Sequence, residues 1–324
     1  VAFERLPEDV PGFGKLGERR AEFQRLREDP AFRSKVRQWD DPVAGLEALG
    51  ARRESMADMG LWYVRRARED GTDYFVVNLS DHAVDGWVTL ATRAARVTLL
   101  DPLTGSAGVG TSERRSSRTR VYLQIDAGQS LILRTDAGGT DLAPWPYSRP
   151  GGTALDLTGP WRLRFTEGGP ELPEPADLST LSSWTRLDDP DAVRFSGTAR
   201  YIIEFDVPGV EAADWLLDLG DVRETARVTL NGRVLGTVWS LPARIHAGRA
   251  VKPGRNVLEI EVTNLPANRI RDLDLRKADW KIMKDINLAS LRYGAFDAAG
   301  WQPQPSGLLG PVRLVPLHAL VPAP

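Results

Sequence analysis

From residue 61 onward, apolar and polar side chains alternate with a period of two in a series of short segments. In 121–126, for example, Val121, Leu123 and Ile125 alternate with polar residues. This period is typical of a β-strand with one buried face. Turn-forming residues separate the segments, so the pattern predicts a small antiparallel β-sandwich. The predicted strands of this group are 61–66, 74–79, 86–90, 95–100, 121–126 and 130–133.

A second series of alternating segments begins near Leu155. Its apolar positions are Trp161, Leu163, Phe165, Tyr201, Ile203, Phe205, Leu258, Ile260 and Val262. Asn231-Gly232 separates two further apolar segments, 228–230 and 233–235, and this dipeptide is a strong signal for a type I′ hairpin turn. The series predicts a jelly-roll-like sandwich.

Residues 15–50 have a helical period instead. Phe23, Leu26 and Arg27 stand at i, i+3 and i+4, and Pro30 breaks the run. Phe32, Val36 and Trp39 restart it, and Pro42 to Leu49 predicts a short last helix with Gly50 as its C-cap. We expect this helical edge to pack on another element.

Composition and charge exclude several functions. The 324 residues are about twice the usual size of one domain, so two or more domains are expected. With 42 basic and 44 acidic residues the net charge is −2, which gives no electrostatic basis for binding nucleic acid or an anionic membrane. No apolar run reaches the roughly 18 residues of a membrane span. The absence of cysteine excludes disulfides, thiolate nucleophiles and Cys-ligated zinc.

Motifs for common catalytic chemistry are also missing. The sequence contains no G-x-S-x-G, no phosphate-binding loop, no dinucleotide fingerprint and no H-E-x-x-H. The three histidines (His82, His246, His318) are far apart in sequence, which disfavours a His-based site. Most carboxylates fall on solvent faces of strands or in turns, so a solvated role is expected for them.

One stretch, 263–274, departs from strand-and-turn composition because it is dense in Asn, Arg and Asp. Planar polar side chains bind sugar hydroxyls, and the indoles that follow can stack on a sugar ring. Alternatively, an Arg–Asp network fixes this long loop segment to a neighbouring domain. A further alternative is that Asp272 and Asp274 hold a structural calcium ion. The candidate residues here are Asn268, Arg269, Asp272, Asp274 and Trp280, with Asn287 and Trp301 following.

Trp239 and Arg244 form a second candidate. Trp239 stands shortly before Pro242, and a tryptophan before a proline turn lies either at the rim of a sandwich or in its core.

Several segments carry a resemblance to known enzymes. Residues 219–222, 226–232 and 235–239 resemble the galactose-binding-like β-sandwich of glycoside hydrolases. Residues 262–270 and 306–314 resemble, more narrowly, the C-terminal part of family 106 α-L-rhamnosidases. The segments 74–78, 85–88 and 100–105 resemble the middle sandwich of that family, and 6–12 is similar to the stretch just before that middle sandwich. The resemblance therefore spans nearly the whole chain.

The resemblance implies a parent enzyme that hydrolyses terminal α-L-rhamnosides and acts in polysaccharide degradation. In that family a (β/α) barrel comes first and carries two catalytic glutamates, with a calcium ion near the sugar, in an inverting mechanism. No glutamate of this sequence matches those motif positions, so no catalytic residue and no required cofactor are assigned to this chain. The family also implies a rhamnose-containing plant or microbial glycan, an upstream catalytic domain as partner, and a periplasmic or secreted location.

The predicted fold class is mainly β, with a short N-terminal helical segment, a small antiparallel β-sandwich and a galactose-binding-like jelly-roll β-sandwich. We assign 1–58 to a helical remnant of an upstream α/β or barrel domain, 59–136 to the small sandwich and 137–324 to the jelly roll. Val1-Ala2-Phe3 is typical of the end of a strand, so we expect a fragment, with a processed mature start as the alternative.

Two functions remain open. In the first, the chain is the non-catalytic C-terminal region of a glycoside hydrolase, bracing the barrel and contacting the glycan. In the second, it is a stand-alone carbohydrate-binding module without hydrolytic activity. An exposed apolar patch on the helices of 15–50 favours the first, because a free-standing binder should not carry one.

Overall fold

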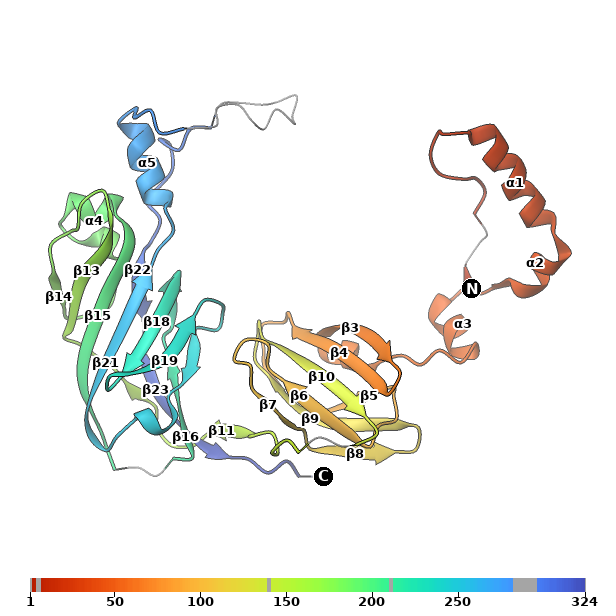
Figure 1. The fold of residues 1–324 in the computed structure, drawn as a ribbon, viewed down its shortest axis with the longest axis horizontal. Coiled ribbons are helices and arrows are strands. Elements are labelled where there is room, and N and C mark those ends of the chain that lie inside the picture. The colour runs from red at the N-terminus through yellow and green to blue at the C-terminus, as the bar shows by residue number, and fades with distance from the viewer. Residues whose placement is uncertain (1, 4–6, 139–140, 210–211, 282–295, 324) are drawn as a thin grey trace. The chain divides into compact units, whose positions relative to one another are not determined.

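The computed structural model describes residues 2–3, 7–138, 141–209, 212–281 and 296–323. It is mainly β, which confirms the predicted fold class (Figure 1). The chain divides into two compact units. Unit 1 consists of Val1–Leu79, Val84–Leu123 and Ser130–Pro144, and unit 2 of Ser80–Ala83, Gln124–Gln129 and Trp145–Pro324. The finer three-domain division stays a prediction.

Three helices open unit 1: α1 (Leu16–Glu28), α2 (Pro30–Lys35) and α3 (Pro42–Ala48). The break at Pro30 and the last helix at Pro42 are confirmed. Asp29 and Asp41 cap α2 and α3, because each carboxylate accepts a hydrogen bond from the backbone N–H two residues further on. None of the described helices has the length and apolar composition needed to cross a membrane.

The helix that restarts after Pro30 is shorter than its apolar spacing predicts. It ends at Lys35, which leaves Trp39 outside it. Arg37–Gln38 instead forms strand β2, which pairs in parallel with β1 (Ala2–Phe3). This pairing joins residues more than 30 positions apart, so the local period could not reveal it. Val1, the start of the predicted strand, lies outside the described residues.

The sandwich of unit 1 has a five-stranded antiparallel sheet in the order β3-β4-β10-β6-β7 and a three-stranded sheet in the order β5-β9-β8. Val121, Leu123 and Ile125 are buried on β9, which confirms the alternation. The strand bounds are β3 (Leu61–Arg68), β4 (Gly71–Asn78), β5 (Val84–Leu90), β6 (Arg96–Leu100), β7 (Ala107–Val109), β8 (Ser112–Arg115), β9 (Arg118–Ile125) and β10 (Ser130–Asp136).

Glu54 is a carboxylate inside unit 1 and is an exception to the solvated role expected for most carboxylates. It precedes the 3₁₀ turn η1 (Ser55–Met59) and is 1% exposed. The carboxylate accepts hydrogen bonds from the Tyr74 hydroxyl at 3.0 Å, Arg65 Nη1 at 2.9 Å and the Ala91 backbone N–H at 2.6 Å. Burial and the Glu54 charge raise the pKa of Tyr74, so its hydroxyl remains a donor. Glu54 therefore ties the turn to three segments of the sandwich.

Unit 2 pairs a six-stranded sheet, β14-β13-β15-β21-β18-β19, with a five-stranded sheet, β11-β23-β16-β20 plus β12 on β23. A third sheet consists of β17 and β22. The strand bounds are β11 (Ser148–Pro150), β12 (Leu155–Asp156), β13 (Trp161–Gly169), β14 (Ala176–Leu178), β15 (Ser196–Val207), β16 (Asp214–Asp218), β17 (Asp221–Arg223), β18 (Thr225–Leu230), β19 (Arg233–Val238), β20 (Arg244–His246), β21 (Gly254–Thr263), β22 (Gly307–Gly310) and β23 (Arg313–Ala319). Its short helical segments are η2 (Trp184–Arg186), α4 (Pro190–Arg194), η3 (Gly248–Ala250) and α5 (Ala267–Leu275).

The predicted hairpin turn at Asn231-Gly232 is confirmed between β18 and β19. Both residues have positive φ, 53° and 77°, as a type I′ turn requires. The Asn231 side chain also donates hydrogen bonds to the Ala250 carbonyl and to Asn256 Oδ1, each at 2.8 Å. The turn residue therefore fixes the neighbouring loop as well.

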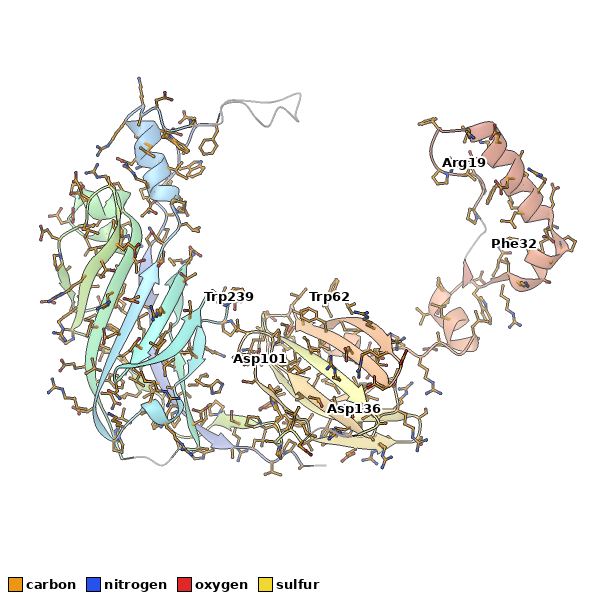
Figure 2. The ribbon with its side chains drawn as sticks, viewed as in Figure 1. Arg19, Phe32, Trp62, Asp101, Asp136 and Trp239 are labelled. Carbon is orange, nitrogen blue, oxygen red and sulfur yellow. The ribbon has the colours of Figure 1, made fainter. Side chains whose placement is uncertain are left out.

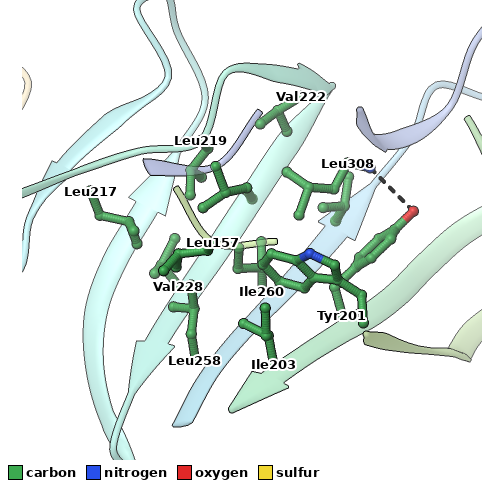
Figure 3. Close-up of a cluster of buried hydrophobic side chains, with 14 of the residues drawn as sticks. Leu157, Tyr201, Ile203, Leu217, Leu219, Val222, Val228, Leu258, Ile260 and Leu308 are labelled. Carbon is green, nitrogen blue, oxygen red and sulfur yellow. Dashed lines mark hydrogen bonds between the residues drawn. The ribbon is translucent and has the colours of Figure 1, made fainter. Parts of the chain in front are cut away.

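The core of unit 2 lies between its two large sheets (Figure 3). Leu258 and Ile260 of β21 and Tyr201 of β15 are fully buried in it, as the alternation predicts. The Tyr201 hydroxyl accepts a hydrogen bond from the Leu308 backbone N–H at 3.2 Å. Gly307, with φ of 103°, makes this approach feasible, because a Cβ there would lie 2.2 Å from that hydroxyl oxygen.

Candidate functional site at helix α5

The polar stretch after β21 forms helix α5 at one end of unit 2 (Figure 1). The sequence predicts an excursion here but not a helix. Asp272 pairs with Arg269 three residues before it and with Arg276 four residues after it, a spacing that stabilises a helix. The predicted site residues on α5 or directly after it are Asn268, Arg269, Asp272, Asp274 and Trp280. We call 267–281 together with 296–306 the α5 cap.

Asn268 fastens the two parts of the α5 cap together. It is 3% exposed, and its Oδ1 accepts a hydrogen bond from the Gln304 backbone N–H at 2.7 Å. Its Nδ2 donates to the Gln304 carbonyl at 2.9 Å and to Ser306 Oγ at 3.3 Å. Asn264 adds a second contact, 3.0 Å, to the same Ser306 hydroxyl. The Asn268 amide is therefore engaged by the chain itself and orients the helix.

Asp272 is surrounded by arginines from two segments. Its Oδ2 lies 2.7 Å from Arg269 Nη1 and 4.0 Å from Arg194 Nη1, and its Oδ1 accepts from Arg276 Nε at 2.8 Å. Arg194 belongs to α4 and also pairs with Asp191. The carboxylate is buried, so it holds these guanidinium groups in fixed positions while part of Arg276 remains exposed to solvent.

Asp274 closes the α5 cap from the other side of the helix. Its Oδ2 accepts a hydrogen bond from the Ala298 backbone N–H at 2.8 Å, and its Oδ1 accepts from Trp280 Nε1 at 2.8 Å. Lys281 Nζ lies 3.1 Å from Oδ1. The bond from Ala298, followed by those from Trp280 and Lys281, holds the pKa of Asp274 below its usual range. The charged carboxylate therefore fixes the Trp280 indole.

Three aromatic rings form a row on the α5 cap. Trp280 meets Phe296 edge to face with ring centroids 6.3 Å apart, and Phe296 meets Trp301 in the same manner at 5.6 Å. Phe296 is 49% and Trp301 40% exposed, so the row presents ring surface to solvent. Lys281 Nζ lies 5.6 Å and 5.3 Å from the centroids of Trp280 and Phe296. We call Trp280, Phe296 and Trp301 the aromatic row.

The aromatic row suits the apolar face of a sugar ring, and nearby cationic groups suit its hydroxyls. Arg271 supports the row, because its Nε donates a 2.7 Å hydrogen bond to the Trp301 carbonyl. Sequence reasoning did not single out Phe296. The feature of the sequence that could have identified it is that Phe296 is an aromatic residue in the segment that follows the polar stretch 263–274. Asn287, named with this stretch, lies outside the described residues.

The structure does not bring Trp239 and Arg244 to the α5 cap. Trp239 follows β19, is 64% exposed and lies away from α5 in the shared view of the figures (Figure 2). Arg244 begins β20, and its guanidinium donates to Asp218 Oδ2 at 2.8 Å and to Asp126 Oδ2 at 2.6 Å. Trp239 is thus a rim residue, and Arg244 bridges two carboxylates of unit 2.

The carboxylates proposed for calcium already accept hydrogen bonds from other groups of the chain. Asp272 is paired with arginines, and both oxygens of Asp274 accept hydrogen bonds, so a cation there would have to displace these partners. Across the part of the chain that the structure describes, no group of three or more His, Cys, Asp or Glu residues stands in a metal-binding arrangement.

Comparison with known proteins relates the chain to glycoside hydrolases. No protein-family profile matches it. It is 33% identical over 186 residues to a protein of Formosa agariphila named "Putative beta-glucuronidase", an alignment that covers 49% of this chain. It also resembles the solved rhamnosidase of Novosphingobium sp. PP1Y, with 27% identity, a TM-score of 0.65 and 86% of this chain aligned. The aligned regions amount to 15% and 26% of those two proteins.

A β-glucuronidase of Bifidobacterium dentium is more distant, with 22% identity over 52% of this chain and 31% of that protein at a TM-score of 0.37. The Formosa agariphila relative and the solved rhamnosidase confirm the predicted likeness to glycoside hydrolases at that level. The chain is similar to a minor part of much longer proteins of this class.

Proposed function

We propose that this chain is a non-catalytic C-terminal region of a glycoside hydrolase of the family 106 α-L-rhamnosidase type. In this proposal it braces a catalytic barrel of the same protein and presents the α5 cap to a rhamnose-containing glycan. The alignment of 86% of the chain with a rhamnosidase supports this assignment over the glucuronidase type.

The observation that carries the proposal is the unburied apolar surface of the N-terminal helices. Among the described residues between 7 and 53, only Gly45 is buried. Phe13 is 94% exposed, and Leu26, Val43, Leu46 and Leu49 are exposed as well. A free-standing soluble module rarely leaves a set of apolar side chains in water, because their burial is the main stabilising term of folding. A larger body that covers these helices accounts for them.

The sandwich of unit 1 adds a second surface of the same kind. Trp62 and Val64 of β3 face outward beside Val77 and Phe75 of β4, their cross-strand partners. Trp62 and Val64 are about two-thirds exposed, and Phe75 is exposed as well. We call these four residues the apolar face. A domain of the parent enzyme that packs on this face would remove it from water.

The α5 cap would act by positioning rather than by chemistry. The carboxylates of Asp272 and Asp274 are engaged in fixed networks, so they orient Arg269 and the aromatic row instead of transferring protons. Removing one positioning contact lowers the rate through substrate orientation. In the parent enzyme, Arg269→Ala should reduce kcat/KM about tenfold. Lys277→Ala, on the same cap, is the matched control, and equal activity of both variants would contradict this role.

The alternative is a stand-alone carbohydrate-binding module. The exposed indoles of Trp301 and Trp239 favour it, because such rings stack on sugars without any catalytic domain. It leaves the apolar surface of the helices unexplained.

The deciding experiment combines the intact mass of the native protein with two assays. We would measure release of nitrophenol from 4-nitrophenyl α-L-rhamnoside and from 4-nitrophenyl β-D-glucuronide. The proposal expects a native mass well above 35.7 kDa and cleavage of the rhamnoside by that protein, with none by the isolated chain. Cleavage of only the glucuronide would refute the rhamnosidase type. A native 35.7 kDa protein that binds glycans without cleaving them would establish the alternative.

Three further features belong to the proposal through the resemblance alone. The parent enzyme would be periplasmic or secreted. It would hold calcium in its barrel, and the two catalytic glutamates would come from that barrel. Signal-sequence analysis of the complete gene and metal analysis of the native enzyme test these features.

A further inference from the structure

A hollow at one end of the unit 1 sandwich combines two unpaired arginines with two aspartates. Its volume is about 290 Å³, and it is lined by the β3–β4 turn, the β5–β6 loop, β8 and the end of β10. All its residues belong to unit 1, so it is separate from the α5 cap. The charged side chains that line it are Asp70, Arg93, Arg114 and Asp136.

Backbone contacts place both arginines at the hollow. The Ala94 backbone N–H donates to Thr119 Oγ1 at 2.9 Å, and Thr119 lies directly opposite Arg114 in the β8–β9 pair. The Ala95 backbone N–H donates to the Asp136 carbonyl at 3.1 Å. The first of these anchors is buried, since Thr119 and Ala94 are both buried. The loop therefore places Arg93 at the same hollow as Arg114.

The two aspartates are neutralised, whereas the two arginines are not. Asp70 Oδ1 lies 2.8 Å from Arg68 Nη1, and Asp136 Oδ1 lies 3.4 Å from Arg96 Nε. Within the described part of the chain, the side chains of Arg93 and Arg114 have neither an ion pair nor a hydrogen bond, although both residues line the hollow. The hollow thus offers unused guanidinium donors beside carboxylate oxygens that can accept further hydrogen bonds.

We propose that this hollow binds an acidic monosaccharide, a uronic acid, through its carboxylate. A guanidinium matches a carboxylate with two parallel hydrogen bonds, so Arg93 and Arg114 suit that group. The hydroxyls of the same sugar can donate to Asp70 and Asp136. Sulfate carries no proton at neutral pH, so it could not donate hydrogen bonds to the two aspartates. The volume is at the small end of ligand pockets, which suits a single ring.

Isothermal titration of the full chain at low ionic strength tests this inference. The probes are D-glucuronate and D-galacturonate, with D-glucose, L-rhamnose and inorganic sulfate as comparisons. We expect saturable binding of a uronate that weakens with added salt, and no binding of the neutral sugars. Absence of uronate binding, or equal binding of sulfate or of a neutral sugar, would overturn the assignment.

Variants locate the site. Arg93→Ala and Arg114→Ala should each raise the uronate Kd about tenfold, the loss of one charge-assisted pair. Arg118→Ala removes the same charge from the same hairpin but does not line the hollow, so its Kd should stay within about twofold of the parent chain. Unchanged Kd in both hollow variants would refute the site. Thermal melting of each variant verifies that it is folded. Because the rhamnoside assay does not involve this hollow, failure of either proposal leaves the other standing.

Discussion

The two units are both β-sandwiches, yet the outer faces of their large sheets differ. Unit 1 buries the carboxylate of Glu54 and leaves the apolar face, with Trp62 and Val64, in solvent. Unit 2 packs apolar side chains between its sheets and places ion pairs on the outer face of the six-stranded sheet. There Arg200 Nη2 of β15 lies 2.6 Å from Glu261 Oε1 of β21, and Arg227 of β18 stands opposite Glu261 on its other side.

This difference indicates which outer face is stable in contact with water and which one would be stabilised by a protein partner. Opposite charges directly across neighbouring strands satisfy each other and remain hydrated, so the outer face of unit 2 needs no partner. The apolar face of unit 1 gains free energy only when something covers it. We therefore expect a solvent boundary at the outer face of unit 2 and a packing surface at the apolar face of unit 1.

The largest expected effect comes from removing the buried carboxylate of Glu54. Glu54→Ala leaves the Tyr74 hydroxyl and the Ala91 N–H buried without their acceptor, and it removes a partner of Arg65. We expect the free energy of unfolding of unit 1 to fall by about 3 kcal/mol. Urea denaturation followed by hydrogen exchange of peptides from each unit measures it.

The matched control is Glu261→Ala on the outer face of unit 2. The Arg200–Glu261 pair is partly exposed to solvent, so its loss should cost less than about 1 kcal/mol. Equal decreases in the free energy of unfolding for the two variants would contradict the stronger stabilising role given to Glu54.

The second test concerns the α5 cap, where unit 2 also buries polar groups. Asn268→Ala removes both contacts to Gln304 and leaves that backbone partly unsatisfied. The cap should lose about 2 kcal/mol of local stability, seen as faster hydrogen exchange in 302–308. Lys277→Ala should leave that exchange unchanged. An Asn268 variant with parent-like protection would mean that other contacts hold the cap.

The third test uses pH. The pKa of folded Asp274 lies below the usual 3.8, because the charged form accepts hydrogen bonds from Ala298, Trp280 and Lys281. Its contribution to stability is therefore complete above the unfolded pKa and is lost as the pH falls from about 4 through the folded pKa. Protection of 270–281 should decrease over that range. In the Asp274→Asn variant, the hydrogen-exchange protection of 270–281 should be lower at neutral pH. It should also change less as the pH falls. A parent-like profile in the variant would contradict this role.

The smallest effect on stability is expected at the apolar face. The double variant Trp62→Ser and Val64→Thr should change the free energy of unfolding by no more than about 0.5 kcal/mol, because both side chains are already exposed. It should reduce self-association, measured by sedimentation velocity at increasing concentration. Arg227→Ala on unit 2 serves as the control. A large loss of stability would mean that unit 1 itself buries these residues.

The sequence predicted the strands well because each strand has one buried face, and burial leaves a local period. Ile260 and Tyr201 follow from alternation alone, and Asn231-Gly232 follows from the positive φ that its turn requires. The sequence also located the polar stretch around Asn268 and Asp274. It did not predict helix α5, because that stretch lacks a clear apolar period.

The amino-acid sequence by itself thus determined the fold class, the main strand faces and the likeness to glycoside hydrolases. The tertiary structure decided which polar groups contact one another. Asn268 meets Gln304 across 36 positions and Glu54 meets Ala91 across 37. Arg93 of the β5–β6 loop and Arg114 of β8 line the same hollow only because the two sheets of unit 1 bring these segments together. Periodicity reports whether a side chain is buried. The partner of a buried or unpaired polar group depends on chain topology, which no local pattern contains.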